Sequence, residues 1–307
     1  MSGIAKTMDT QDWGLLIFLS VLWGGAFFFA GVAVKELPPL TVVLIRVSLA
    51  ALALLPIFLY FGHTFPTSLI AWLPFLGMGL LNNVLPFGFI FAGQTHITVG
   101  LSSIINAMTP LFTIVIMAAF REERLTVCRV IGVLLGVVGV GTLRGLEAPI
   151  GGAQTVGITL CMAGALSYGF AALWGRRRLA SVAPIKSATC QLICSTIMMA
   201  VIVVLIDKPW TLSVPSQKTI CSLLALAVLG TSLAYIVFFQ ILARAGASNV
   251  MLVTLLIPIT ALILGNAFLG ERIQSTEIIG AIIIGIGLIF IDGRLIDRIT
   301  GRLEATK

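Results

Sequence analysis

Long apolar runs alternate with short breaks of charged residues, proline or glycine along the whole chain. A helix needs about 20 apolar residues to cross the ~30 Å hydrocarbon layer of a bilayer, and each run comes close to or exceeds that length. The pattern predicts ten membrane-spanning helices, at 13–34, 40–61, 69–92, 98–120, 126–143, 154–174, 185–206, 219–242, 247–269 and 275–292. The least distinct boundary is 93–98, which carries no charge.

The composition agrees with a chain whose solvent is lipid. Hydrophobic residues make up 59% and charged residues only 10%, whereas soluble domains have about one-quarter charged residues. The predicted fold class is therefore an all-α integral membrane protein. The net charge of +7 does not indicate nucleic-acid binding, because the basic residues are scattered between apolar runs and form no basic stripe.

The basic residues predict the orientation in the membrane. Ten spans would put both termini on one side, and 13 of the 19 Lys and Arg residues fall there. Five fall on the other side, namely Lys35, Arg144, Lys208, Lys218 and Arg272, and Arg46 lies within a span. The positive-inside rule then places the N- and C-termini in the cytoplasm, and we expect a multi-pass protein of a bacterial inner membrane.

Two parts of the chain repeat each other at a constant offset. Residues 107–139 align with 255–287, so that Pro110 matches Pro258 and the Ala-Phe-x-x-Glu-Arg pattern of 119–124 recurs at 267–272. We expect a first five-helix repeat at 1–145 and a second at 146–307, which ends in a short cytoplasmic tail. Because five is odd, the two repeats would insert with opposite orientations, as in many secondary transporters. The first run has a counterpart in the second repeat, so it is expected to be a span and not a cleaved signal peptide.

Several of these features together resemble the EamA family of the drug/metabolite transporter superfamily. They are Trp23-Gly24-Gly25 in the first span, Arg46 followed by an Ala/Leu run in the second, and Pro110 with Glu123-Arg124 at the end of the fourth. The resemblance implies a ten-helix inverted-repeat fold with cytoplasmic termini that exports small metabolites such as amino acids. Length and layout are similar to a branch that exports aromatic amino acids. Cys190 sits where a second arginine would match, so any role of Arg46 is not duplicated.

Polar and aromatic residues inside the spans are candidates for a central substrate cavity, because polar groups within a membrane usually face the protein interior. The candidates are Trp23, Asn82, Asn83, Ser103, Asn106, Tyr168, Thr231, Tyr235 and Thr254. Amides, hydroxyls and aromatic rings would suit an amphipathic metabolite. The alternative is that the hydroxyls satisfy their own helices and the rings pack ordinarily.

Three prolines and one arginine have two interpretations each. Pro86, Pro110 and Pro258 interrupt the backbone hydrogen bonding of a span, and so serve either as hinges or as static kinks. Arg46 either receives a substrate carboxylate or bonds backbone carbonyls, and the second, structural role is favoured.

The pattern as a whole predicts a secondary or facilitative transporter working by alternating access, with amino acids as favoured substrates. Sugars, nucleosides or drugs, or a channel-like pore, are the alternatives. All acidic residues lie in loops, tails or at span ends, which favours facilitated or loosely coupled transport.

No catalytic, nucleotide or metal motif is present, so we expect no enzyme activity, no cofactor and no metal. The expected partners are a small-molecule substrate and lipid. Close helix packing at 132–136 serves either the monomer, which is favoured, or a homodimer.

Overall fold

The computed structural model describes residues 8–123, 125–144 and 152–292, and every regular element in these ranges is helical. The predicted repeat boundary at 145–146, Arg124 of the family motif and the C-terminal tail lie outside the described residues. The elements are α1 (Thr10–Ala33), α2 (Pro39–Tyr60), α3 (Leu69–Gly79), η1 (Leu80–Val84), α4 (Leu85–Gln94), α5 (Val99–Asn106), α6 (Thr109–Ala119), α7 (Val127–Arg144), α8 (Ala153–Arg178), α9 (Pro184–Ile206), η2 (Pro209–Thr211), α10 (Gln217–Ala227), η3 (Val228–Leu233), α11 (Ala234–Ala245), α12 (Ala247–Val250), α13 (Val253–Leu269) and α14 (Ser275–Asp292).

The helices are long and apolar enough for a multi-pass membrane protein. Seven uninterrupted helical stretches have membrane length, and three shorter apolar helices, Val127–Leu143, Val253–Leu269 and Ser275–Ile291, are also found in the described chain. Helical segments coincide with the predicted apolar runs to within four residues at each end. The uncharged boundary at 93–98 is a real break, where the Thr98 side chain caps α5 by accepting the Leu101 amide.

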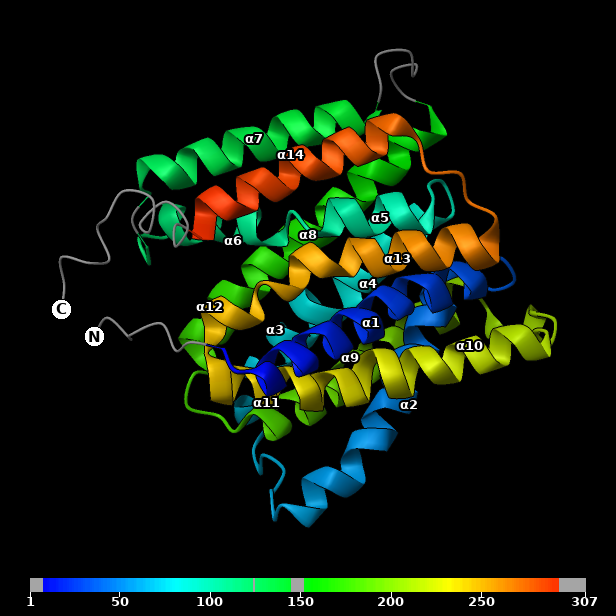
Figure 1. Ribbon diagram of the computed structural model, residues 1–307. Helices are drawn as coiled ribbons and strands as arrows, with labels where there is room; N and C mark the ends of the chain where they lie inside the picture. The colour runs from blue at the N-terminus through cyan, green and yellow to red at the C-terminus, as the bar shows by residue number, and fades with distance from the viewer. Residues whose placement is uncertain (1–7, 124, 145–151, 293–307) are drawn as a thin grey trace.

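Packing partners far apart in sequence lie side by side in the bundle (Figure 1). α1 packs on α13, and α8 packs on α5 and α6. α4 packs on α8, while α10 and α11 pack on α1. α2 packs on α9, α5 on α13, and α7 on α14. The start of α1 meets the end of α11 at one end of the bundle. We call this the terminal end, and we call the opposite end of the bundle the far end.

Glycines bring α7 and α14 into direct backbone contact. A methyl group on Gly132 would lie 2.6 Å from the carbonyl oxygen of Gly287, and one on Gly287 would lie 2.7 Å from that of Gly132. Gly139 and Gly280 face each other in the same way, at 3.1 and 2.9 Å. These contacts make α7 and α14 antiparallel, and they use the 132–136 stretch for packing within the chain.

Two π-helical turns interrupt the long helices. η1 joins α3 to α4, and η3 joins α10 to α11. The two lie 148 residues apart in sequence, which is the offset of the repeat. Isolated π-helical turns in α-helices often occur at functional sites, because they rotate the side chains that follow.

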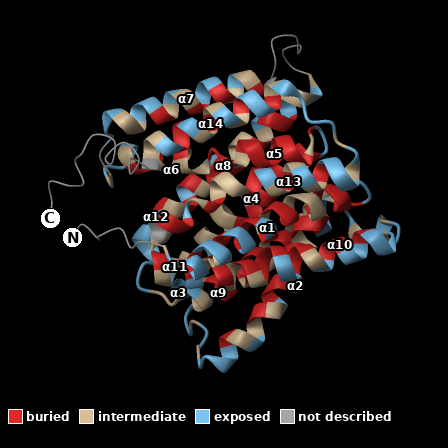
Figure 2. Ribbon diagram, viewed as in Figure 1, coloured by how far each residue is buried: buried red, intermediate tan, exposed pale blue. Residues whose placement is uncertain are grey.

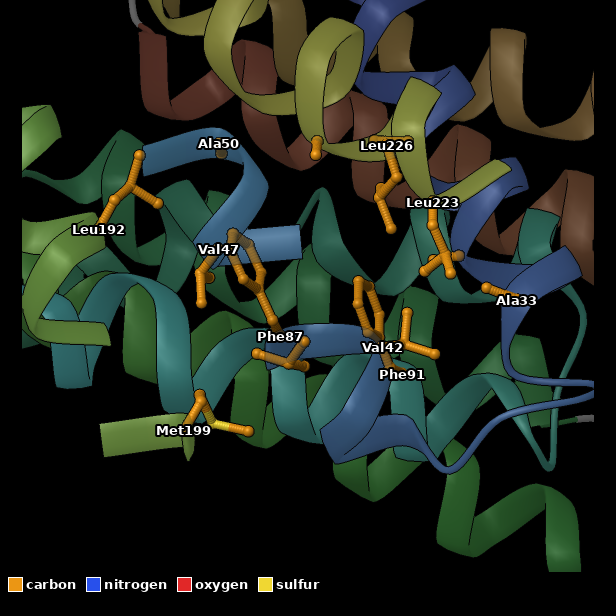
Figure 3. Packing of buried hydrophobic residues seen from close by; sticks show 14 of the residues in the cluster. Ala33, Val42, Val47, Ala50, Phe87, Phe91, Leu192, Met199, Leu223 and Leu226 are labelled. Carbon is orange, nitrogen blue, oxygen red and sulfur yellow. The ribbon is translucent and has the colours of Figure 1, made fainter. Parts of the chain in front are cut away.

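The core lies along the middle of the bundle, and large apolar side chains cover its outside. Figure 2 shows buried residues gathered around α1, α5 and α13 and exposed ones along α7. Leu69 and Ile70 are 89% and 78% exposed, as expected for side chains that face lipid. In the main core, Phe87 and Phe91 of α4 pack beside Val42 and Val47 of α2 (Figure 3).

Candidate functional site

Arg46 of α2 lies buried in the middle of the bundle, with 7% of its surface exposed. Its Nε donates a hydrogen bond of 2.9 Å to Oγ1 of Thr231, and one terminal nitrogen donates a long one of 3.5 Å to the carbonyl of Gly230. Both acceptors belong to η3. The π-helical turn therefore presents a hydroxyl and a backbone carbonyl to the arginine.

Aromatic rings surround the guanidinium. Its central carbon lies 3.7 Å from the ring centroid of Phe87 and 5.6 Å from that of Phe91, which are distances of cation–π contact. Tyr168 of α8 and Tyr235 of α11 pack against the same core as Phe87 and Phe91, and both are half-buried. The charge is thus stacked on one face and bordered by two tyrosines.

Asparagines of the other π-helical turn form a hydrogen-bonded network with Tyr235. The amide nitrogen of Asn82 lies 3.3 Å from the Tyr235 hydroxyl, which in turn donates at 3.3 Å to Oδ1 of Asn83. The Asn82 nitrogen also reaches Oε1 of Gln191 at 3.4 Å, and that of Asn83 reaches Oγ of Ser195 at 3.0 Å. Two residues of η1 are therefore held by α9 and α11.

Among the residues that the structure describes, none that contacts Arg46 carries a negative charge. The ion pairs found in the described chain lie at the terminal end, where Arg244 meets Asp9 and Asp12, and Arg176 and Arg177 meet Glu122 or Glu123. No described carboxylate lies within ion-pair distance of Arg46. The same residues hold no group of three side chains able to bind a metal ion.

The predicted residues divide into two groups. Arg46, Asn82, Asn83, Tyr168, Thr231 and Tyr235 come together in what we call the central cluster. Trp23 packs on Phe238 of α11, with the ring centroids 5.5 Å apart.

Three other predicted residues do not join the central cluster. The hydroxyls of Ser103 and Thr254 bond backbone carbonyls three residues earlier, those of Gly100 and Met251, as the alternative interpretation expects. Asn106 at the end of α5 keeps a buried Oδ1 without a partner among the described residues.

The prolines differ from one another despite their matching positions. Pro86 and Pro110 each stand near the start of a helical element, α4 and α6, and Pro86 directly follows η1 within the uninterrupted helical stretch Leu69–Gln94. Pro258 lies inside the continuous helix α13. The second half of the described chain has a further helix break between α12 and α13, upstream of Pro258.

Sequence reasoning missed Gln191, Ser195 and Phe87. The repeat alignment matches Arg46 with Cys190, whereas Gln191 and Ser195 stand one helical turn apart in the same apolar run. That spacing was the available signal. The hydroxyl of Ser195 also accepts from Asn83 while lying 2.7 Å from the carbonyl of Gln191.

The far end contains a cavity of about 540 Å³. It is bordered by the loop after α4, the start of α5 and the residues between α13 and α14, including His96, Gln94 and Glu271. Glu271 accepts the backbone amides of Val99 and Gly100 at 2.8 and 3.3 Å and so ties the end of α13 to the start of α5.

Another carboxylate joins two segments at the same end. Glu36, in the loop after α1, accepts the hydroxyl and the amide of Ser216 at 2.6 and 2.7 Å. The hydroxyl bond, followed by the amide bond, lowers the pKa of the Glu36 carboxyl below its ordinary value of 4.5.

Comparisons with known proteins agree with this architecture. The sequence model described as the EamA-like transporter family matches residues 12–144 and 155–292. The chain is 28% identical to the uncharacterized transporter YvbV of Bacillus subtilis, over 88% of either chain. It is 26% identical to a probable amino-acid metabolite efflux pump of Salmonella typhimurium, over 92% of this chain and 94% of that one. A crystal structure with 18% identity superposes with a TM-score of 0.66 over 94% of this chain and 98% of that chain, and so supports the fold alone.

Proposed function

The chain belongs to the EamA-like transporter family, and from this premise we propose that it is a secondary or facilitative carrier that exports small metabolites, with amino acids as the favoured substrates. Two considerations favour amino acids. A relative of nearly equal length is named as a probable amino-acid metabolite efflux pump, and the central cluster combines amides, hydroxyls and aromatic rings. Such a lining suits a small amphipathic molecule.

The proposed architecture is ten spans in two inverted repeats, divided near 145–146. The packing supports it, because exchanging the halves maps the pairs onto one another. In this exchange α1 takes the place of α8, α13 that of α6, and the α10–α11 segment that of α3–α4. The contact of α1 with α13 then corresponds to that of α8 with α6, and the contact of α4 with α8 corresponds to that of α10 and α11 with α1. Pairs of equivalent helices, α2 with α9 and α7 with α14, map onto themselves, as they would about a two-fold axis.

One observation carries the proposal of alternating access. The side-chain hydrogen bonds found within the central cluster, and those from it to α9, each join one half of the chain to the other: Arg46 to Thr231, Asn82 to Gln191 and Tyr235, and Asn83 to Ser195 and Tyr235. A substrate bound there would touch both halves. If the halves rock against each other, the same bonds break and re-form around the substrate, which is how inverted-repeat carriers expose a fixed site to alternate sides.

The π-helical turns support movement at this point. Thr231 and Ser232 of η3 return hydrogen bonds to the carbonyls of Leu226 and Ala227, five residues earlier, at 3.0 and 3.1 Å. Ser167 donates to the carbonyl of Leu81 in η1 at 2.8 Å. Side chains thus satisfy backbone groups that the regular helical pattern leaves open, and the backbone there can change without exposing unpaired groups to lipid.

We place the carrier in a bacterial inner membrane with both termini in the cytoplasm. It works as a monomer without a cofactor, because the site and both repeats lie in one chain. The described acidic residues fall outside the central cluster, which favours facilitated or loosely coupled transport.

The test is counterflow in proteoliposomes. Vesicles containing the purified protein are loaded with one unlabelled amino acid, Phe, Trp, Thr or Met, and uptake of the labelled form is followed. Saturable uptake that requires the internal substrate supports a carrier for amino acids. Counterflow of sugars or nucleosides but not of amino acids would show that the proposed substrate class is wrong and that the carrier mechanism is right. Flux that rises without saturation would indicate a channel-like pore and overturn the carrier mechanism.

A further inference from the structure

We infer that Arg46 is the binding site for one carboxylate group of the substrate, so that the transported molecules are small monocarboxylates, amino acids among them. The inference rests on the proposed function and deepens it, because it names the chemical feature that the central cluster requires.

The first step is the charge balance of the site. Burying an arginine in a membrane protein is costly unless a partner offsets its charge, and such residues usually mark a functional site. Arg129, Arg176, Arg177 and Arg244 have carboxylate partners near the helix ends. Arg46 is more deeply buried than these, and its contacts within the described chain are neutral. No described side chain balances its charge, and a ligand carboxylate would supply the missing negative charge.

The second step is the number of donors that remain. A guanidinium carries five N–H groups in a planar fork that matches a carboxylate. Nε is bonded to Thr231, and among the described residues the guanidinium makes one further hydrogen bond, the long one of 3.5 Å to Gly230. Phe87 covers one face of the plane at 3.7 Å. The terminal nitrogens therefore retain N–H groups for a ligand, and a carboxylate fits them edge to edge.

The third step is access. Asn82, Tyr168 and Tyr235 are half-buried, whereas Phe87, Thr231 and Asn83 are buried. A ligand that reaches Arg46 would therefore pass the half-buried side chains, while the buried ones hold the arginine in place.

The fourth step concerns the rest of the ligand. Besides the arginine, η1 and α9 supply neutral amides and a hydroxyl, from Asn82, Gln191 and Ser195. One positive and one neutral side suit a molecule with a single negative charge and a neutral or ammonium group a few ångströms away. A dianion such as a phosphate monoester would bring a second negative charge that no described side chain here offsets.

The experiment compares acids with their amides. Proteoliposomes are tested for counterflow of phenylalanine and methionine and of phenylalaninamide and methioninamide, which differ only in the carboxyl group. The wild type should prefer each acid over its amide by at least tenfold in uptake. The R46Q variant should lose acid uptake by at least tenfold and keep its amide uptake. R177Q is the matched control, because Arg177 pairs with Glu122 at the exposed terminal end, and it should behave as wild type.

Equal uptake of acids and amides by the wild type would overturn the inference and leave the carrier function standing. Loss of both uptakes in a monodisperse R46Q protein would also overturn it, because that result means a purely structural arginine. If R46Q does not fold, R46K decides. It keeps the charge without the fork, and should retain the preference for acids at a higher half-saturation concentration.

A binding measurement separates failure of the inference from failure of the proposed function. If no substrate shows counterflow, the carrier proposal fails, and thermal unfolding of the detergent-purified protein is measured with the same four compounds. A rise in Tm with the acids alone, absent in R46Q, would support the carboxylate site by itself. No rise with either acid would overturn it.

Discussion

The carboxylate of Glu271 lies 2.8 Å from the backbone amide of Val99, whereas Glu123, which stands at the equivalent point of the first repeat, pairs with Arg129 and Arg176. The two equivalent carboxylates thus have different partners in the same conformation: one binds backbone amides and the other binds arginines. Glu271 joins the end of α13 to the start of α5, and Glu123 belongs to a group of partly exposed ion pairs at the terminal end.

Replacing Glu271 by alanine should destabilise the protein more than replacing Glu123. E271A leaves two amides at the start of α5 without their charged acceptor, which costs about 1–3 kcal/mol. E123A removes partly exposed ion pairs worth less than about 1 kcal/mol. Thermal unfolding in detergent measures the difference, and equal shifts in Tm for the two variants would contradict this role of Glu271.

Adding a methyl group at Gly132 should separate α7 from α14. The new carbon would lie 2.6 Å from the Gly287 carbonyl, and overpacking of this kind costs about 1–3 kcal/mol. Gly141 of the same helix has nothing within 4 Å of such a methyl group, so G141A is the matched control. The Tm of G132A should fall and that of G141A should hold or rise. An unchanged Tm for G132A would mean that the helices separate at no cost.

Removing the Tyr235 hydroxyl should impair transport more than stability. Y235F breaks the bridge between Asn82 and Asn83, at a cost in stability of about 0.5–1.5 kcal/mol. Counterflow should fall several-fold, because the two asparagines lose their fixed orientation toward the substrate. Y60F is the control, since Tyr60 is 86% exposed at the end of α2, and it should transport as wild type. Normal transport by Y235F would show that the Tyr235 hydroxyl takes no part in the substrate site.

Glu36 should contribute to stability in a pH-dependent way. Its pKa is lower in the folded than in the unfolded state, because the Ser216 hydroxyl and amide bond the ionised carboxylate. The contribution is therefore fully present above the unfolded pKa near 4.5 and is lost as pH falls through the lower, folded pKa. The Tm difference between wild type and E36Q should be constant above about pH 5.5 and shrink as the pH falls below 4.5. A difference that does not change with pH would disprove the linkage.

The positions of the helices could be predicted because the membrane imposes a length on apolar runs. Even the uncharged boundary at 93–98 is found where the sequence indicated it, since Thr98 can cap a helix and Gly93 precedes it. The π-helical turns could not be predicted. An extra residue per turn changes the backbone hydrogen bonding without changing the composition, so 80–84 and 228–233 look like ordinary apolar helix.

The central cluster could be predicted in part, because the membrane also limits which residues occur within spans. Polar residues are rare within spans, so Arg46, Asn83 and Tyr235 stood out in the sequence. Their partners on α9 did not, because alignment of the repeats pointed to Cys190 and the contacts are made by its neighbour Gln191 and by Ser195. The hydroxyls of Ser103 and Thr254 show the reverse error, since a polar side chain in a span can be satisfied by its own helix.

The glycine contact between α7 and α14 is symmetric under the sequence offset of 148, which matches Gly132 with Gly280 and Gly139 with Gly287. The offset therefore maps the contact of Gly132 with Gly287 onto that of Gly280 with Gly139. A surface that is complementary to its own copy is what two identical chains need in order to pair. The α7–α14 contact therefore has the self-complementary form of an interface between identical chains, although both helices belong to one chain.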